Sequence, residues 1–101
     1  MPDHDHALPK KERLILDLLV SADHPLFGLE LVRVSNGSLK RGTVYATLAR
    51  MQAKGLVTSE QEELPDGAIG LPRRMFRPTP LGKRVLRAWV VLARELALGV
   101  R

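Results

Sequence analysis

The sequence of 101 residues contains no cysteine. This absence excludes a disulfide framework, a thiolate nucleophile and a zinc site built on cysteine. The chain also has no uncharged apolar run of about 18 residues, and its N-terminus does not resemble a signal peptide. We therefore expect a soluble cytoplasmic protein with no membrane partner.

Residues that commonly carry catalysis are scarce. The three histidines, His4, His6 and His24, fall in a polar N-terminal segment and in a turn. No paired carboxylates, glycine-rich phosphate loop or Ser/His/Asp set occurs in a segment that predicts a rigid site. His4 and His6 stand beside Asp3 and Asp5, but no scaffold is predicted to hold them in the geometry of a metal site. The sequence predicts neither an enzyme nor a metal or cofactor site.

Positive charge is unevenly distributed along the chain. The formal net charge is +5; residues 38–59 contain four Lys/Arg and no acid, and residues 67–94 contain seven and no acid. Four acids lie between these clusters of cations, at Glu60, Glu62, Glu63 and Asp66. Segregated positive charge attracts phosphate and usually dominates non-specific affinity for nucleic acid. The alternative is a basic surface that serves only solubility.

Periodic apolar residues predict two helices in the first third of the chain. Residues 1–9 are polar, lie between prolines and indicate a flexible tail. Leucine and isoleucine recur at i and i+4 between Lys10 and about Ala22, which predicts an amphipathic helix. A shorter helix is predicted from Leu26 to Val34, before a turn at residues 35–37.

A basic helix that begins between Ser38 and Arg41 and ends before Gly55 is the most informative element. At 100° per residue its apolar side chains form one stripe, which can be buried and consists of Val44, Leu48 and Met51. A separate face about a quarter turn away is predicted to be exposed and consists of Thr43, Thr47, Arg50 and Lys54.

The pattern changes after Gly55. Residues 56–62 and 73–77 have the alternating and β-branched character of two paired strands, and residues 64–72 form the connecting loop. A long helix follows, because Thr79 is a good N-cap before a proline and apolar periodicity continues to about Leu98.

Helix, helix, basic helix and hairpin, in this order, form a winged helix-turn-helix. We predict an α+β, mainly α fold with three core helices, a two-stranded β-wing and a long C-terminal dimerisation helix. Residues 1–9 would be the tail, 10–78 the DNA-binding domain, and 79–101 the C-terminal helix packed on the same domain.

Three motifs resemble the PadR family of bacterial transcriptional regulators. Gly28-Leu29-Glu30-Leu31 is similar to a Gly-Tyr-Glu-Leu run of the second helix. Residues 41–46, Arg-Gly-Thr-Val-Tyr-Ala, are similar to the Pro-Gly-Thr-Leu-Tyr-Pro start of the third. Residues 72–76, Pro-Arg-Arg-Met-Phe, with Thr79, are similar to a wing motif. The resemblance extends from about residue 14 to residue 86, with Lys40 and Arg41 as departures that replace a small hydroxyl residue and a proline.

The basic helix, the wing and the resemblance together predict a DNA interface. Hydroxyl groups of Thr43 and Thr47 can bond phosphate or base edges. The resemblance implies a phosphate contact for Tyr45, whereas its angle on the helix favours half-buried packing. The predicted DNA-binding residues are Lys40, Arg41, Gly42, Thr43, Tyr45, Thr47, Arg50, Lys54, Arg73 and Arg74.

Alternatives remain open for several of these residues. Arg50 and Lys54 are predicted to clamp the DNA backbone, and Lys54 could equally stabilise the negative end of its helix. Gly42 would permit close approach or is simply a weak helix start. Arg73 and Arg74 are consecutive in a strand, so their side chains point to opposite faces and only one can meet DNA unless the ribbon twists.

The C-terminal helix is predicted to form a homodimer, because a small three-helix core covers only part of its apolar arc. The predicted interface consists of Leu81, Val85, Trp89, Leu92 and Leu96. The resemblance implies that a small aromatic effector can bind at such an interface beside an aromatic residue. Core or interface packing is the simpler role for Trp89.

We therefore predict a cytoplasmic homodimer that binds double-stranded DNA at an inverted repeat and represses transcription, without a cofactor. The alternative is a winged-helix module that binds protein or RNA and has no operator-specific DNA binding. Double-stranded RNA hides its major groove from a helix, so a comparison of the two duplexes separates these hypotheses.

Overall fold

The computed structural model describes residues 8–99. The predicted tail up to residue 7, with His4 and His6, lies outside this range. The helices are α1 (Lys10–Ala22), α2 (Gly28–Val34), α3 (Arg41–Ala53) and α4 (Pro80–Gly99), and the strands are β1 (Leu26–Phe27), β2 (Val57–Gln61) and β3 (Arg74–Pro78). This order confirms the predicted winged helix-turn-helix.

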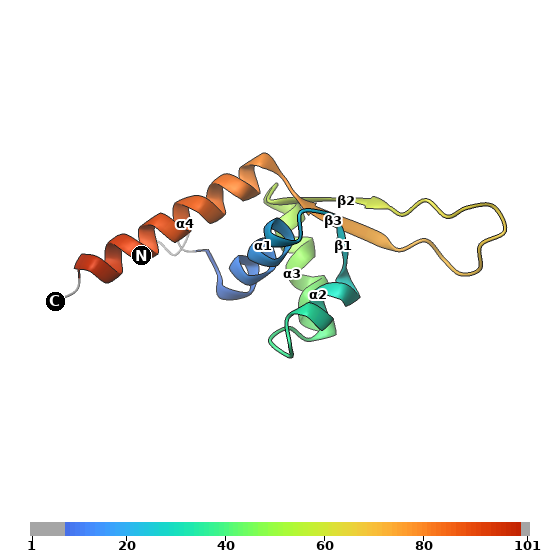
Figure 1. Ribbon diagram of the computed structural model, residues 1–101, viewed down its shortest axis with the longest axis horizontal. Helices are drawn as coiled ribbons and strands as arrows, with labels where there is room; N and C mark the ends of the chain where they lie inside the picture. Colours follow the sequence, from blue (N-terminus) through green and yellow to red (C-terminus); the bar gives the residue numbers. More distant parts are fainter. Residues whose placement is uncertain (1–7, 100–101) are drawn as a thin grey trace.

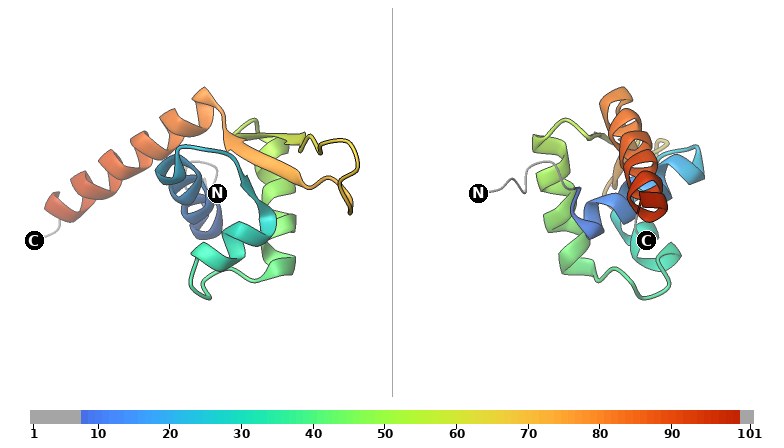
Figure 2. Two further views of the ribbon diagram at one scale, coloured as in Figure 1. Left: turned by 45° about the vertical axis from the view of Figure 1, so that its right-hand side comes forward. Right: turned by 90° about the vertical axis from the view of Figure 1, so that its left-hand side faces the viewer.

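The molecule is elongated, with extents of 61 × 27 × 25 Å along its principal axes. Figure 1 shows α1, α2 and α3 in the middle, the hairpin of β2 and β3 at one end and the C-terminal turns of α4 at the other. The left view in Figure 2 shows the C-terminal turns of α4 projecting beyond the other helices. The wing and the last turns of α4 are therefore the two most outlying parts of the described chain.

The sheet has three strands in the order β1-β3-β2, all antiparallel, rather than the two predicted. Leu26 and Phe27 were expected to begin the second helix; instead Leu26 pairs with Phe76 and Phe27 with Met75. The backbone N–H of Phe27 donates to the Glu30 carboxylate at 2.9 Å. This bond caps α2, which begins at the next residue, Gly28. The expectation was wrong because pairing with a distant strand outweighed helical periodicity.

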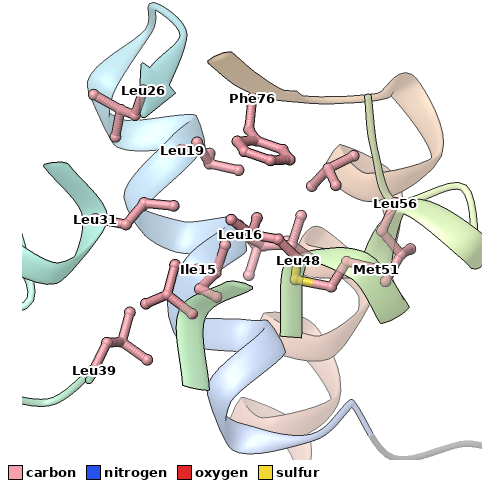
Figure 3. Packing of buried hydrophobic residues seen from close by; sticks show 13 residues of the cluster. Ile15, Leu16, Leu19, Leu26, Leu31, Leu39, Leu48, Met51, Leu56 and Phe76 are labelled. Carbon is pink, nitrogen blue, oxygen red and sulfur yellow. The ribbon is translucent and has the colours of Figure 1, made fainter. Parts of the chain in front are cut away.

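The core is formed by the apolar stripe of α1 against α3, the sheet and the first half of α4. Figure 3 shows Ile15, Leu16 and Leu19 pointing toward Leu48 and Phe76. Burial of each such leucine or isoleucine contributes about 1.5–3 kcal/mol to folding. The predicted buried stripe of the basic helix is confirmed, since Val44, Leu48 and Met51 are all buried.

Two turns fix how the wing and α4 leave the core. Gly55 ends α3 with φ +78°, a left-handed conformation that favours glycine. The hydroxyl of Thr79 donates to the Gly55 carbonyl at 2.6 Å and accepts from the N–H of Gly82 at 3.0 Å, which confirms the predicted N-cap. A Cβ at Gly82 would overlap the carbonyl oxygen of Leu56, so α4 can approach the wing closely only with glycine there.

Candidate nucleic-acid interface

The turn before α3 holds the start of this helix at the surface. Asn36 and Gly37 have φ values of +52° and +88°, which reverse the chain between α2 and α3. The buried hydroxyl of Ser35 accepts the N–H of Leu39 at 3.0 Å and donates to the Val32 carbonyl at 2.8 Å. With Leu39 anchored in the core, the next residue, Lys40, begins an exposed helix start.

The N-terminal end of α3 is cationic and open. Lys40, Arg41, Gly42 and Thr43 are all exposed, and the first turn contains no acid. Among the described residues, no acidic side chain forms an ion pair with Lys40 or Arg41. The free N–H groups of a helix start carry partial positive charge and commonly bind phosphate. A Cβ at Gly42 would meet no atom within 4 Å, so the protein's own packing does not require glycine there.

Tyr45 combines the two roles that the sequence left open, an exposed hydroxyl that can meet phosphate and half-buried packing of its ring. Its side chain keeps 44% exposure while its ring lies over Gly28, where a Cβ would come within 2.5–2.8 Å of the ring and hydroxyl atoms. The hydroxyl end thus lies at the junction of α2 and α3, and Gly28 makes the space for the ring.

The predicted exposed position of Thr47 is wrong. Its exposure is 0%, and its hydroxyl accepts a hydrogen bond from the Arg50 guanidinium at 3.2 Å. The buried arc of α3 is therefore wider than the apolar stripe, and Thr47 connects through Arg50 to Glu12 of α1, whose carboxylate lies 3.9 Å from Arg50 Nε. Thr43, one turn earlier, is exposed as expected.

A buried carboxylate occupies the other end of α3. Glu12 of α1 is 1% exposed and receives the Lys54 ammonium at 2.9 and 3.0 Å, with Arg50 Nε 3.9 Å away. Sequence analysis did not single out Glu12. The available signal was its spacing, since Glu12 lies on the same helical stripe as Ile15, Leu16 and Leu19, where an acid needs a partner.

The two wing arginines point in different directions, as strand alternation predicted. The guanidinium of Arg73 forms two bonds of 3.0 and 3.1 Å with the Glu62 carboxylate and stacks 3.6 Å from the Phe27 ring centre. This pairing lowers the pKa of Glu62 and raises the pKa of Arg73. Arg73 is therefore largely engaged within the wing.

Arg74 lies on the wing face that meets α3. Its guanidinium donates to the Ser59 hydroxyl at 3.2 Å, and that hydroxyl bonds the side-chain oxygen of Gln52 in α3 at 3.2 Å. The tip of the wing is apolar and acidic rather than cationic, because Ile69 and Leu71 are exposed there and follow the acids Glu62, Glu63 and Asp66. The base of the wing, rather than its tip, brings a cation next to α3.

The predicted dimer residues divide into two groups. Leu81, Leu92 and Leu96 are 41%, 44% and 58% exposed, whereas Val85 is partly buried against the core. Trp89 is partly covered, with the Arg13 guanidinium 5.1 Å from its ring centre. Exposed apolar side chains thus occur at Leu81 in the first turn of α4 and at Leu92 and Leu96 in its C-terminal half, whose last turns the left view of Figure 2 shows beyond the other helices.

An open pocket of about 550 Å³ lies between α1 and α4. Its lining includes the apolar side chains of Trp89, Leu86 and Leu14 and the charged residues Arg13, Asp17, Lys10 and Lys11. Within residues 8–99, no cluster of three metal-ligating side chains occurs. No helix in that range is both long and apolar enough to cross a membrane.

The sequence profile of the transcriptional regulator PadR-like family matches residues 15–88. The chain is 44% identical over 62 residues to the transcriptional regulator Rv3488 of Mycobacterium tuberculosis, a match that covers 57% of this chain and 54% of that protein. The chain thus spans about half the length of this relative.

Solved structures share the fold. A PadR family transcription regulator from Clostridium difficile R20291 has a TM-score of 0.68 and 28% identity, over 85% of this chain and 88% of that chain. Bacillus subtilis PadR, crystallised in complex with operator DNA, has a TM-score of 0.72 and 21% identity, over 82% of this chain and 48% of that chain. At 21% identity this second likeness concerns the fold alone.

Proposed function

The chain belongs to the PadR-like family of transcriptional regulators, and from this premise we propose that it represses transcription by binding an inverted-repeat DNA operator as a homodimer. The observation that carries the proposal is the exposed start of α3, where Thr43 follows Lys40 and Arg41, two cations that form no ion pair among the described residues. Helix-turn-helix proteins insert this end of the second helix of the motif into the major groove.

The predicted residues in the first half of α3 and in the wing have distinct roles in this proposal. Lys40 and Arg41 bind phosphates, Thr43 reaches base edges, and Gly42 lets the DNA backbone approach. Tyr45 offers its hydroxyl to phosphate from the α2–α3 junction. Arg74, at the base of the wing, contacts the neighbouring backbone, while Arg73 positions the hairpin through Glu62. Thr47 contributes through its bond to Arg50 rather than through DNA.

The homodimer is proposed to form through the exposed apolar residues of α4. A contiguous apolar patch of several hundred Å² usually marks an interface. A two-fold dimer places two copies of α3 in successive turns of the major groove, so half-sites should lie about ten base pairs apart or a multiple of this. Binding of both half-sites would exclude polymerase from the promoter.

The pocket beside Trp89 supports an effector role as a second part of the proposal. Apolar side chains together with three cations and one acid, Asp17, give the lining a net positive charge, which suits a small aromatic molecule that carries negative charge. Trp89 is the only tryptophan, so its fluorescence reports directly on this pocket. Quenching by an aromatic acid, with weaker DNA binding in its presence, is the expected result; no quenching by a panel of such acids contradicts it.

The test of DNA binding is fluorescence anisotropy across a salt series. A random 30-mer duplex is compared with DNA from upstream of the chain's own reading frame, and with duplex RNA of equal length. We expect steep salt dependence for both DNAs and about 10³-fold or tighter binding of the upstream DNA at physiological salt. No binding to either DNA at low salt refutes the proposal, and preference for RNA supports the alternative module.

A further inference from the structure

Glu12 connects α1 with the C-terminal end of α3 through charge. Its carboxylate is buried, yet the two cations that face it remain half exposed, 49% for the Lys54 side chain and 58% for Arg50. These cations can turn either toward Glu12 or toward an external phosphate. At present both Lys54 bonds, at 2.9 and 3.0 Å, go to Glu12.

Packing alone does not require an acid at this position. A buried carboxylate loses its hydration, and replacement of a buried ion pair by apolar residues is often neutral or stabilising. Ile15, Leu16 and Leu19, on the same side of α1, already supply apolar contacts. The buried charge at Glu12 therefore favours a role other than stability.

The two ends of α3 differ in how much positive charge is available. At the N-terminal end, Lys40 and Arg41 have no acidic partner among the described residues, and the helix dipole adds partial positive charge. At the C-terminal end, the Glu12 carboxylate offsets about one of the two cations, and the dipole is negative. The strongest attraction for phosphate is thus directed to the end with Thr43.

We infer that Glu12 is a positioning residue that sets DNA specificity: it holds Arg50 and Lys54 against α1 and so confines phosphate attraction to the base-reading end of α3. This inference rests on the DNA-binding function proposed above. Phosphate contacts carry no sequence information, so two freed cations would raise affinity for every duplex without improving base readout. Glu12 lowers binding to random DNA more than binding to the operator.

The experiment compares Glu12→Gln with Asp23→Asn in the full chain. Both variants remove one negative charge, but Asp23 is exposed just beyond the opposite end of α1, with φ +58°, a conformation that asparagine tolerates. Anisotropy is measured over a salt series with the random 30-mer and the upstream DNA, and thermal unfolding checks that each variant is folded.

For Glu12→Gln we expect the slope of log K against log salt to steepen by about 1, with random DNA bound about threefold or more tightly at low salt. The ratio between upstream and random DNA should fall, whereas Asp23→Asn should match the parent. Equal slopes for both variants overturn the inference. A folded Glu12→Gln variant that loses affinity for both DNAs also overturns it, since Glu12 would then be presenting the cations to phosphate.

A second pair of variants, Lys54→Gln and Arg41→Gln, tests the inference if Glu12→Gln does not fold. Lys54→Gln should reduce the salt slope less than Arg41→Gln does, because Glu12 already engages the Lys54 charge, whereas Arg41→Gln should reduce the slope by about 1. Equal reductions in the two variants overturn the inference. A parent protein that binds neither DNA refutes the proposed function and the inference with it, whereas a DNA-binding parent with equal slopes refutes only the inference.

Discussion

At the scale of single residues, the bidentate pair of Arg73 and Glu62 makes the wing sensitive to acid. The guanidinium lowers the pKa of Glu62, so the folded-state value lies below the unfolded one. The pair therefore stabilises the hairpin above the unfolded pKa, and this contribution is lost as pH falls through the lowered folded value. Near neutral pH the pair is fully formed.

We expect Arg73→Gln to raise the titration midpoint of the Glu62 carboxylate, measured by carbon NMR of the side chain. Arg74→Gln is the control, because it removes the same charge from a neighbour that bonds Ser59 rather than Glu62. A Glu62 midpoint that moves equally in both variants would show that general charge, rather than the paired geometry, causes the shift.

Thr43 and Thr47 provide a second test at this scale. Thr43 is exposed at the cationic helix start, whereas the hydroxyl of Thr47 is buried against Arg50. We expect Thr43→Ala to reduce the preference for operator over random DNA by about tenfold, corresponding to about 1.4 kcal/mol. Thr47→Val keeps the volume and should cost about 1 kcal/mol of unfolding free energy.

The measurements are competition binding for the first variant and denaturant unfolding for both. Thr47→Val should retain the parent's sequence preference, because its hydroxyl does not face the groove. Loss of that preference in a stably folded Thr47→Val variant would contradict the assignment and restore Thr47 as a base-contacting residue.

At the scale of elements, two glycines in helix starts have opposite environments. A Cβ at Gly28 in α2 would lie 2.5–2.8 Å from the Tyr45 ring, whereas a Cβ at Gly42 in α3 would meet nothing within 4 Å. We expect Gly28→Ala to destabilise the fold by about 1–3 kcal/mol through displacement of the ring. Gly42→Ala should stabilise it by about 0.5–1 kcal/mol, since alanine favours helix.

Thermal unfolding of the Gly28→Ala variant, measured in the parent and in a Tyr45→Ala background, checks this explanation. The Gly28→Ala penalty should largely disappear once the ring is removed, because the two changes act on one contact. An unchanged penalty would mean that the backbone of α2, rather than Tyr45, requires glycine. In DNA binding, a more stable Gly42→Ala variant with weaker affinity would support close approach of the DNA backbone at this residue.

At the scale of the whole molecule, the last turns of α4 and the wing lie at opposite ends of a 61 Å particle (Figure 1). The proposed dimer surface on α4 is therefore separate from the proposed DNA-binding surface on α3 and the wing. A change on the exposed half of α4 should alter oligomeric state without unfolding the core, because Leu96 is 58% exposed and Leu86 supplies the buried contact.

We expect Leu96→Glu to weaken the homodimer by about 100-fold or more, since a two-fold interface would bury the new charge twice. Sedimentation equilibrium measures the dissociation constant, and operator binding should weaken in parallel. Leu71→Glu, at an exposed position in the wing loop, is the control for oligomeric state. A dimer that persists in Leu96→Glu would place the interface elsewhere.

Much of the fold followed from local signals in the chain. The first helix was predicted at Lys10–Ala22 and begins and ends there, and the wing strands were predicted within one residue at most ends. The Thr79–Pro80 start of α4 was also predicted and has the expected cap. Apolar period, caps and left-handed glycines act over a few residues, so they can be recognised without knowledge of the partner elements.

The sequence by itself thus determined the order of the four helices and the two wing strands, the buried stripe of α3 and the cationic character of its start. Only tertiary structure decided the pairing of Leu26 with Phe76, the burial of Thr47 and the bond between Glu12 and Lys54, which lie 42 positions apart. The reason is physical. Helical period and capping are contained within one segment, whereas burial of a polar side chain depends on which distant element packs against it and which charged residue that element carries.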